Sequence, residues 1–206
     1  NLRGKTILGG RKGGMPEMTL EYVMRKNGVI PNEDATVDTS VQFNMMAGAF
    51  VGGEADYVAL FEPTATEVEL AGQGVVLCSI GEQSGEIPYT AYFAAQSYLT
   101  ENADTVLRFT RAIARGQEWV YAHTDRELAE AIVGYFPDTS VEVLEKVAAR
   151  YKGIRAWKET PDMKQEALER LETVMEQAGE LSQRVAYEAL VENEFAYHVM
   201  AEMGQK

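Results

Sequence analysis

The first 94 residues alternate short apolar runs with amphipathic segments, and the clearest unit lies at 5–28. It begins with Lys-Thr-Ile-Leu, continues through a turn with four glycines, and ends in a segment of helical period. Pro16 suits the first helical position and Gly28 suits the C-terminal cap. The apolar positions of this helix are Leu20, Val23 and Met24. The pattern predicts a buried strand, a glycine-rich turn and an amphipathic helix.

Further strand and helix signals alternate up to residue 94. Short β-prone runs predict strands at Thr36–Thr39, Asp56–Phe61 and Val75–Ile80, and a further extended run at Ile87–Ala94. The segments between them predict helices at 43–51 and Pro63–Ala71. Strands separated by helices of about ten residues are typical of a mostly parallel sheet. Cys78, inside the third run, is expected to be a buried thiol.

Residues 95–206 have the pattern of a nearly all-helical segment. Helices are predicted at Ala103–Ala122, after the capping boxes Thr124–Glu127 and Thr139–Glu142, from Thr160, and at Glu188–Met200, with a loop at Tyr151–Glu159. The apolar faces of these helices are expected to pack against a sheet. The pattern therefore divides the chain into an α/β part at 1–94 and a helical part at 95–206.

Charge and composition limit the kinds of molecule that this chain is expected to bind. The 206 residues carry a formal net charge of −13, which argues against nucleic acid, because phosphate backbones require clustered cations. The sequence has no apolar run long enough to span a membrane and no recognisable signal peptide. Because the chain begins with Asn at the threshold of a strand, we expect a processed or truncated product. The single cysteine forbids an internal disulfide.

The distribution of charge leaves two kinds of ligand open. No Lys or Arg occurs from Asn27 to Leu107, so an anion bound by the first half of the chain would depend on Arg11 and Lys12. Acidic residues would instead favour a ligand that offers N–H donors or positive charge. These acids are Glu17, Glu62 and Glu86.

The sequence offers no catalytic, metal or cofactor motif. The two histidines, His123 and His198, lie on or beside predicted helices and away from any nucleophile motif. No Cys/His cluster has metal-ligand spacing. The glycine-rich turn lacks the closing Gly-Lys-Ser/Thr of a P-loop and does not match the dinucleotide fingerprint G-x-G-x-x-G. We therefore predict no catalytic residue, no bound metal and no cofactor.

Candidate ligand-binding segments follow the predicted strands. They are the turn Gly9–Glu17, the run Leu60–Thr64 with Glu62, the run Ser84–Thr90 with Tyr89, and, as a weaker candidate, Gln42-Phe43. In open α/β sheets, ligands bind outside the carboxyl ends of the strands. Each position also has a structural alternative: Tyr89 as core, Glu62 beside a helix N-cap, and Gln42 as a surface residue.

Several segments together resemble the solute-binding proteins of ABC importers, with the type II periplasmic-binding fold. The resemblance covers essentially the whole chain and is nearest to the sulfonate, nitrate and thiamine-pyrimidine-precursor group. The segments that carry it are Leu2-Arg-Gly-Lys-Thr-Ile, the glycine-rich turn, Gly48–Ala59, Phe61-Glu-Pro-Thr-Ala, Ile87–Ala94, and the pattern Ser97–Asn102 followed by Phe109–Ile113.

The resemblance implies two α/β lobes with a ligand cleft between them. Residues 1–94 would be the second lobe, and residues 95–206 would be helices that return to lobe one, whose first part of about a hundred residues would be absent. Such a protein binds a small polar or aromatic solute outside the cytoplasm and delivers it to an ABC permease. Membrane association would then occur only through a lipid anchor or the permease.

The resemblance also implies roles for individual residues. The second-lobe ligand loop corresponds to Arg11–Glu17, with contacts expected from Arg11, Gly13, Gly14, Met15 and Glu17. Glu62 would be an acceptor, Tyr89 would pack against a ring, and Gln42 adds a polar group. Two departures stand out: Glu62 replaces the commoner Asp, and Gly13-Gly14-Met15 replaces the Gly-Ser-Ser turn of sulfonate binders. The second departure removes two hydroxyl donors and disfavours a sulfonate ligand.

Two other functions use the same fold. One is a sensor or interaction domain that does not take part in transport. The other is an enzyme like the fungal branch that makes the thiamine pyrimidine, whose active site is rich in Cys and His. Nothing equivalent occurs in this sequence, so the resemblance favours a binding protein over an enzyme.

Overall fold

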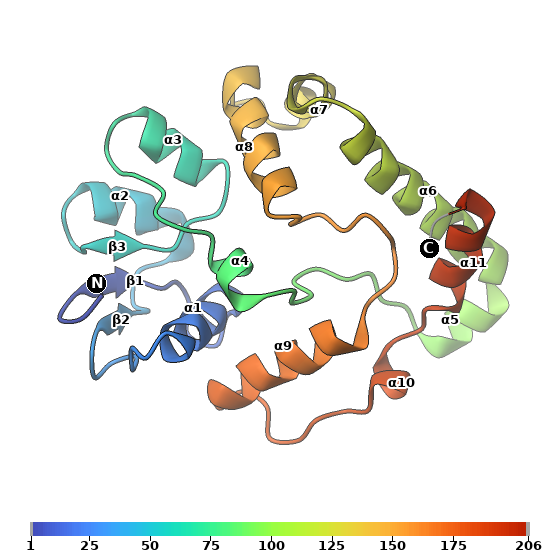
Figure 1. The fold of residues 1–206 in the computed structure, drawn as a ribbon, viewed down its shortest axis with the longest axis horizontal. Helices are drawn as coiled ribbons and strands as arrows, with labels where there is room; N and C mark the ends of the chain where they lie inside the picture. The colour runs from blue at the N-terminus through green and yellow to red at the C-terminus, as the bar shows by residue number, and fades with distance from the viewer. Residues whose placement is uncertain (1, 205–206) are drawn as a thin grey trace. The chain divides into compact units, whose positions relative to one another are not determined.

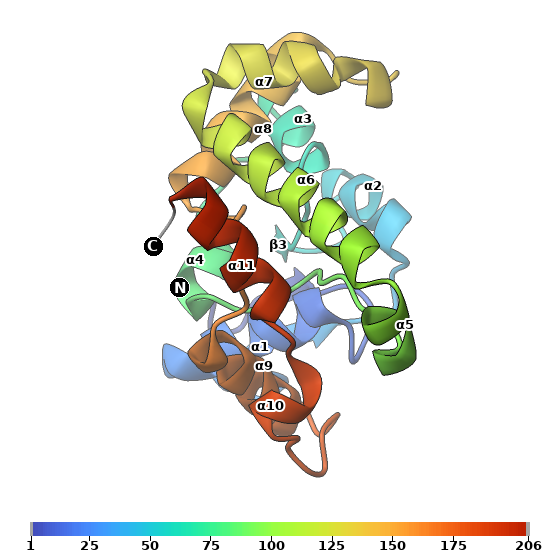
Figure 2. The same cartoon turned by 90° about the vertical axis from the view of Figure 1, so that its right-hand side faces the viewer.

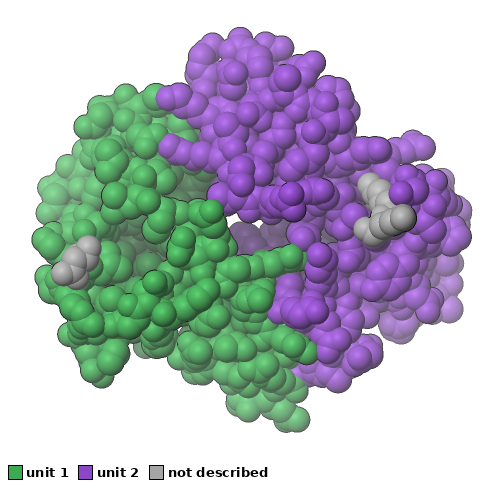
Figure 3. All heavy atoms as spheres, in the orientation of Figure 1, with its two compact units in different colours: residues 1–87, 169–184 green, residues 88–168, 185–206 purple. Residues whose placement is uncertain are grey.

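The computed structural model describes residues 2–204, which form two compact units. The first unit contains residues 1–87 and 169–184, and the second contains residues 88–168 and 185–206 (Figure 3). The chain thus passes from the first unit to the second, returns for a short segment, and leaves again.

The first unit is built on a small parallel sheet of three strands (Figure 1). The strands are β1 (Thr6–Leu8), β2 (Thr36–Asp38) and β3 (Tyr57–Val58). Their order is β2-β1-β3, with Ile7 opposite both Val37 and Tyr57. Because all three strands run parallel, their carboxyl ends meet at one edge of the sheet.

Helices and a short 3-10 turn complete the first unit. They are α1 (Met15–Lys26), η1 (Phe43–Met45), α2 (Met46–Val51), α3 (Thr64–Leu70), α4 (Ile80–Ser84), and the greater part of α9 (Gln165–Gln177). Pro16 lies in the first turn of α1, and α1 ends at Asn27 and Gly28, which has a φ of +71°. Both ends of α1 therefore follow the predicted signals.

The core of the first unit lies between α1 and the sheet. Its buried members come from α1, from the three strands and from positions next to them: Ile7, Leu20, Met24, Ala35, Val37 and Ala59. Leu20 and Met24 are one helical turn apart, so the same face of α1 covers β1 and β2. Lys26 Nζ also donates to the carbonyl oxygen of Gln83 at 2.9 Å, which ties the end of α1 to α4.

In the second unit, helices are the only regular secondary structure among the described residues, and loops join them (Figure 2). Its elements are α5 (Gln96–Glu101), α6 (Ala103–Ala122), α7 (Asp125–Ile132), η2 (Val133–Tyr135), α8 (Val141–Gly153), the first residues of α9, α10 (Tyr187–Leu190) and α11 (Glu194–Met203). α7 packs against α8, and α11 packs against α6. The guanidinium of Arg111 on α6 pairs with Glu202 on α11 at 2.8 Å.

The predicted fold class is confirmed: a mostly parallel α/β sheet is followed by a helical segment. Strands at Thr36–Thr39 and Asp56–Phe61 are present, the second shortened to two residues. The helix at Ala103–Ala122 has the predicted bounds, and Thr124 and Glu127 form the predicted capping box. These sequence signals act locally, and the elements that they predict keep their positions in the folded chain.

The prediction of a buried strand at Val75–Ile80 is wrong. This segment lies outside the sheet, Val75 and Leu77 are largely exposed, and Cys78 is exposed rather than buried. The backbone N–H of Val76 donates to the side chain of Glu69 at 3.2 Å, so that amide does not enter a ladder. The neighbouring edge strand β3 pairs over only two residues and offers little edge for a fourth strand.

Three predicted helix boundaries in the second half are also wrong. Ser140, not Thr139, caps α8, because its hydroxyl accepts from the N–H of Val143. The helix expected from Thr160 begins at Gln165, and the helix expected over Glu188–Met200 is divided into α10 and α11. Asn193 contributes to both differences, since its side chain accepts from the N–H and donates to the carbonyl of Met163. Those bonds hold the backbone of Met163 outside a helix and place Asn193 at the start of α11.

Candidate functional site

The candidate site lies where the three parallel strands end. The ladder of the sheet continues one residue beyond the strands, because Gly9 N–H donates to the carbonyl of Asp38 and Ala59 N–H to that of Leu8, both at 2.9 Å. Three loops then leave the same edge of the sheet. They are the glycine-rich turn (residues 9–14), the segment 39–42 and the segment 60–63. This edge is where open α/β sheets bind ligands.

The glycine-rich turn is shaped by close approaches that exclude side chains. A Cβ at Gly9 would lie 2.6 Å from Cγ1 of Val37, so β2 leaves no room for a side chain there. Gly13 has a φ of +71°, a conformation in which glycine is favoured. The chain therefore needs glycine at these positions to turn tightly from β1 into α1.

The buried carboxylate of Glu17 closes this turn from the first turn of α1. Its Oε2 accepts a hydrogen bond from the N–H of Gly13 at 3.1 Å, while the residue is only 4% exposed. Burial raises the pKa of Glu17 above its ordinary value, the bond from Gly13 opposes the rise, and nearby Glu21 adds to it. The charge of Lys12 also opposes the rise in pKa.

A second carboxylate approaches the same turn from a distant part of the sequence. Glu180, which follows α9, lies so near Gly13 that a Cβ on this glycine would be 2.8 Å from Oε1 of Glu180. Both residues belong to the first unit. The turn is therefore flanked by Glu17 on one element and Glu180 on another.

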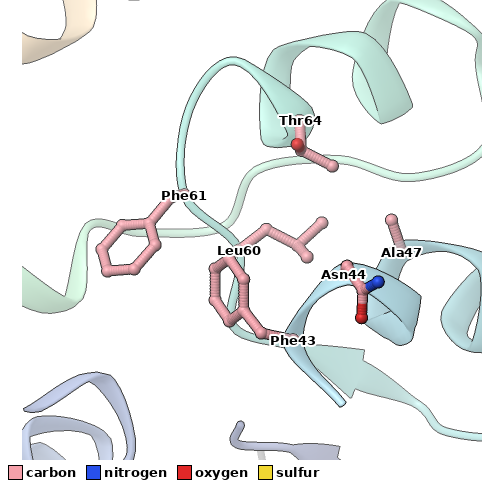
Figure 4. Close-up of a pocket in the computed structure, with 6 residues that line it drawn as sticks. All are labelled: Phe43, Asn44, Ala47, Leu60, Phe61 and Thr64. Atoms are coloured by element: carbon pink, nitrogen blue, oxygen red, sulfur yellow. The ribbon is translucent and has the colours of Figure 1, made fainter. Parts of the chain in front are cut away.

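An aromatic pocket of about 320 Å³ opens beside the turn (Figure 4). We use this name for the space lined by Phe43, Asn44, Ala47, Leu60, Phe61 and Thr64. The rings of Phe43 and Phe61 have centroids 5.3 Å apart and planes inclined by 47°. Both rings are partly exposed, at 46% and 37%. The pocket thus joins the segment after β2 to the segment after β3.

The glycine-rich turn adjoins the aromatic pocket. A Cβ at Gly10 would lie 4.0 Å from Cδ2 of Phe43 and 3.7 Å from Sδ of Met46, which is fully buried under this region. The loops after all three strands therefore contribute to one continuous surface of the first unit. Side chains from that surface can provide ring stacking, an amide from Asn44 and a hydroxyl from Thr64.

The structure places the predicted site residues in different surroundings. Arg11, Gly13, Gly14, Met15 and Glu17 lie together, with Arg11 exposed, Gly14 capping α1 and Met15 beginning it. Their roles in binding a ligand stay predictions.

The other three predicted residues are separated from the turn in sequence. Gln42 is exposed and directly precedes Phe43 of the pocket. Glu62 lies between Leu60–Phe61 and Thr64, and its Oε2 accepts from the N–H of Thr66 at 3.0 Å. Tyr89 belongs to the second unit and is 57% exposed. This hydrogen bond supports the structural alternative for Glu62, in which its side chain stabilises the start of α3.

Sequence reasoning named two segments that reach the pocket, Leu60–Thr64 and Gln42-Phe43, but within them it selected Glu62 and Gln42 as the site residues. It gave no role to the lining residues Phe43, Phe61 and Thr64, and it missed Asn44. The available signal was an aromatic residue shortly after each of the two strands that flank β1. Within residues 2–204, no group of three or more His, Cys, Asp or Glu side chains is arranged to hold a metal ion. None of the described helices has the length and hydropathy of a membrane span.

Comparison with known proteins gives consistent matches. Residues 1–127 match the family described as NMT1/THI5 like. A protein of Bacillus subtilis (strain 168), named "Putative binding protein YtlA", is 42% identical over 201 residues, which is 98% of this chain and 60% of that protein. A solved structure from Bordetella bronchiseptica RB50 superimposes with a TM-score of 0.70 at 16% identity, covering 99% of this chain and 66% of its own. The chain thus spans about two thirds or less of the length of each of these two proteins. At 16% identity, the likeness to the Bordetella structure concerns the fold alone.

Proposed function

This chain belongs to the NMT1/THI5-like family, and from that premise we propose that it is part of a solute-binding protein of an ABC importer. The 42% identical Bacillus protein is named as a binding protein, which supports a binding role here. The ligand is a small polar or aromatic solute. The permease and a location outside the cytoplasm belong to the same proposal.

The observation that carries the proposal is the continuous surface at the carboxyl ends of the three strands. The aromatic pocket and the glycine-rich turn meet there, at the edge where α/β folds bind ligands. A volume of about 320 Å³ falls in the usual range of small-molecule sites. In this proposal residues 1–94 are one lobe of the binding protein, and residues 95–206 are helices that return to the other lobe.

The proposed mechanism is closure of two lobes on the solute. A ligand shifts such an equilibrium only by the difference between its affinities for the closed and open states. The first unit would contribute the backbone of the glycine-rich turn, Arg11, and the rings of Phe43 and Phe61. Gln42, Glu62 and Tyr89 keep the roles that the family resemblance implies.

A binding role is preferred to catalysis for a chemical reason. The family description also covers proteins like THI5, and an enzyme of that kind is the competing function. This chain has one cysteine, Cys78, and two histidines, His123 and His198, so it lacks the Cys- and His-rich set of side chains that the resemblance attributes to the active site of that enzyme.

A thermal-shift screen of the full-length protein tests the proposal. The panel contains sulfonates, nitrate, aminopyrimidines, flavin-like compounds and unrelated small metabolites. A true ligand at about 100 times its dissociation constant adds roughly 2.7 kcal/mol to the free energy of unfolding. The Phe61→Ala variant should lose the shift, while Leu70→Ala, at an exposed position of α3 outside the pocket, should retain it. Absence of a shift from every compound, or turnover of a bound compound, would overturn the proposal.

A further inference from the structure

The glycine-rich turn already contains its own anion. Backbone N–H groups before a helix normally attract phosphate, sulfonate or carboxylate groups of ligands. Here the N–H of Gly13 is taken by Oε2 of Glu17 at 3.1 Å, and Glu17 is buried. An incoming oxyanion at this point would have to displace a carboxylate of the protein.

The second carboxylate makes that displacement less favourable. Oε1 of Glu180 lies within van der Waals distance of the space beside Gly13. An oxyanion bound at the turn would therefore face Glu17 and Glu180 together. The cations of the turn are Arg11 and Lys12, and Lys12 already interacts electrostatically with Glu17.

The charge of the whole first unit acts in the same direction. Residues 1–87 and 169–184 contain eight Lys and Arg against sixteen Asp and Glu. The segments that follow β2 and β3 lie in the stretch from Asn27 to Leu107, which has no Lys or Arg at all. A site surrounded by one sign of charge raises the local concentration of neutral and oppositely charged ligands relative to like-charged ones.

The aromatic pocket supplies what such a ligand would contact. Its six lining residues are uncharged, and two of them are phenylalanines whose ring centroids are 5.3 Å apart. The rings are partly exposed, so a further ring can stack on them. A cationic group beside the ring would also gain from the faces of Phe43 and Phe61.

We infer that the first unit receives a neutral or cationic ring of the solute, and that an oxyanion such as a sulfonate or nitrate is not bound there. This inference rests on the proposed solute-binding function. It decides between the two kinds of ligand that the sequence left open, and it assigns ring recognition to Phe43 and Phe61. Glu17 and Glu180 are the groups that discriminate against anions.

Four probes that share one ring test the inference on the full-length protein. Benzylammonium, benzyl alcohol, benzoate and benzenesulfonate are titrated while the aromatic NMR signals of Phe43 and Phe61 are followed. The first two should shift these signals. The two anions should bind at least about fivefold more weakly than benzyl alcohol, because their charge is repelled by the carboxylates of Glu17 and Glu180 even in water. Equal or tighter binding of the anions, or no binding of any probe up to its solubility limit, overturns the inference.

Variants show whether the named residues are responsible. Phe61→Leu keeps an apolar side chain and removes the ring, so it should weaken benzyl alcohol by about two- to tenfold. Leu70→Ala, outside the pocket, should leave that affinity unchanged. Glu180→Gln should raise the affinity for benzoate and lower it for benzylammonium. If Phe61→Leu or Glu180→Gln changes none of these affinities, the assignment is wrong.

The two proposals can fail separately. If the metabolite screen identifies a sulfonate or nitrate as the ligand, the solute-binding function stands and the inference about ligand charge is overturned. If no metabolite binds and only the ring probes do, the pocket has the inferred chemistry but the proposed function fails. A neutral or cationic ring compound found in both experiments supports both.

Discussion

The carboxylate of Glu17 accepts a hydrogen bond from the backbone N–H of Gly13, and this contact joins the first turn of α1 to the glycine-rich turn before it. In a capping box, a glutamate three residues after the N-cap bonds the N–H of the N-cap itself, whereas Glu17 bonds the N–H of the residue before the N-cap. Here the N-cap is Gly14, which has no side chain to cap the helix, and Glu17 is buried. The conformation of the candidate ligand loop therefore depends on a carboxylate inside the protein.

The first prediction concerns the pH dependence of stability at Glu17. Because burial raises the pKa of Glu17, the folded state binds this proton more readily than the unfolded state. Its contribution to the free energy of unfolding should then fall as pH rises from about 4.5, the ordinary value, through the raised folded value. Glu17→Gln keeps an acceptor for Gly13 and removes the charge. We expect the free energy of unfolding of this variant to exceed that of the parent protein by most at neutral pH, and this difference to shrink toward pH 4.

Hydrogen exchange of the β1 amides, measured at several pH values, reports this difference for the first unit. Glu33→Gln removes a charge from an exposed position and is the matched control. It should not reproduce the pH-dependent gain. A Glu17→Gln protein whose stability relative to the parent grows toward acid pH would contradict the prediction.

The second prediction concerns the core between α1 and the sheet. Met24 is 2% exposed and belongs to the buried cluster with Leu20 and Val37. Met24→Ala should lower the stability of the first unit by about 2–5 kcal/mol, because it leaves a cavity. Met45→Ala, at a residue 59% exposed, is the control and should stay within about 0.5 kcal/mol. Exchange of the β1 amides gives both values, and similar costs for the two variants would argue against this core.

Local sequence signals predicted much of the fold. Pro16 and Gly28 bound α1, and Thr124 with Glu127 begins α7, because each of these signals acts within one helical turn. Two of the wrong helix boundaries involve a distant partner. The hydrogen bond between Asn193 and Met163 joins residues thirty positions apart, and no local pattern of apolar and polar residues predicts it.

The candidate site shows the same limit. Its position at the carboxyl ends of the strands followed from the alternation of strands and helices. The pairing of Phe43 with Phe61 did not, because it depends on how two loops fold over the sheet edge. The approach of Glu180 to Gly13 was equally hidden, since α9 returns to the first unit after the chain has passed through the second.

The third prediction concerns the capping box of α7. Thr124 Oγ1 accepts from the N–H of Glu127 at 3.2 Å, and Glu127 Oε2 accepts from the N–H of Thr124 at 2.8 Å. Thr124→Ala should cost about 0.5–2 kcal/mol, whereas Thr124→Ser keeps the hydroxyl and should cost much less. Both tryptophans, Trp119 and Trp157, lie in the second unit, so urea unfolding followed by their fluorescence measures the effect. Equal losses for the two variants would mean that the hydroxyl does not cap the helix.

The fourth prediction uses two glycines with opposite surroundings. A Cβ at Gly9 would lie 2.6 Å from Cγ1 of Val37, a buried side chain that its β-branch makes stiff, so Gly9→Ala should cost about 1–3 kcal/mol. Gly48, inside α2, has nothing within 4 Å of the same position, and Gly48→Ala should stabilise by about 0.4–1 kcal/mol.

A double-mutant cycle then separates the clash from a general effect of alanine at Gly9. In the Val37→Ala background the offending methyl group is gone, so the added cost of Gly9→Ala should fall by 0.5 kcal/mol or more, the order of coupling seen for residues in contact. Exchange of the β1 amides provides all four stabilities. If the cost of Gly9→Ala is the same in both backgrounds, the close approach of β2 is not what requires glycine at the end of β1, and the turn into the candidate site is held by other contacts.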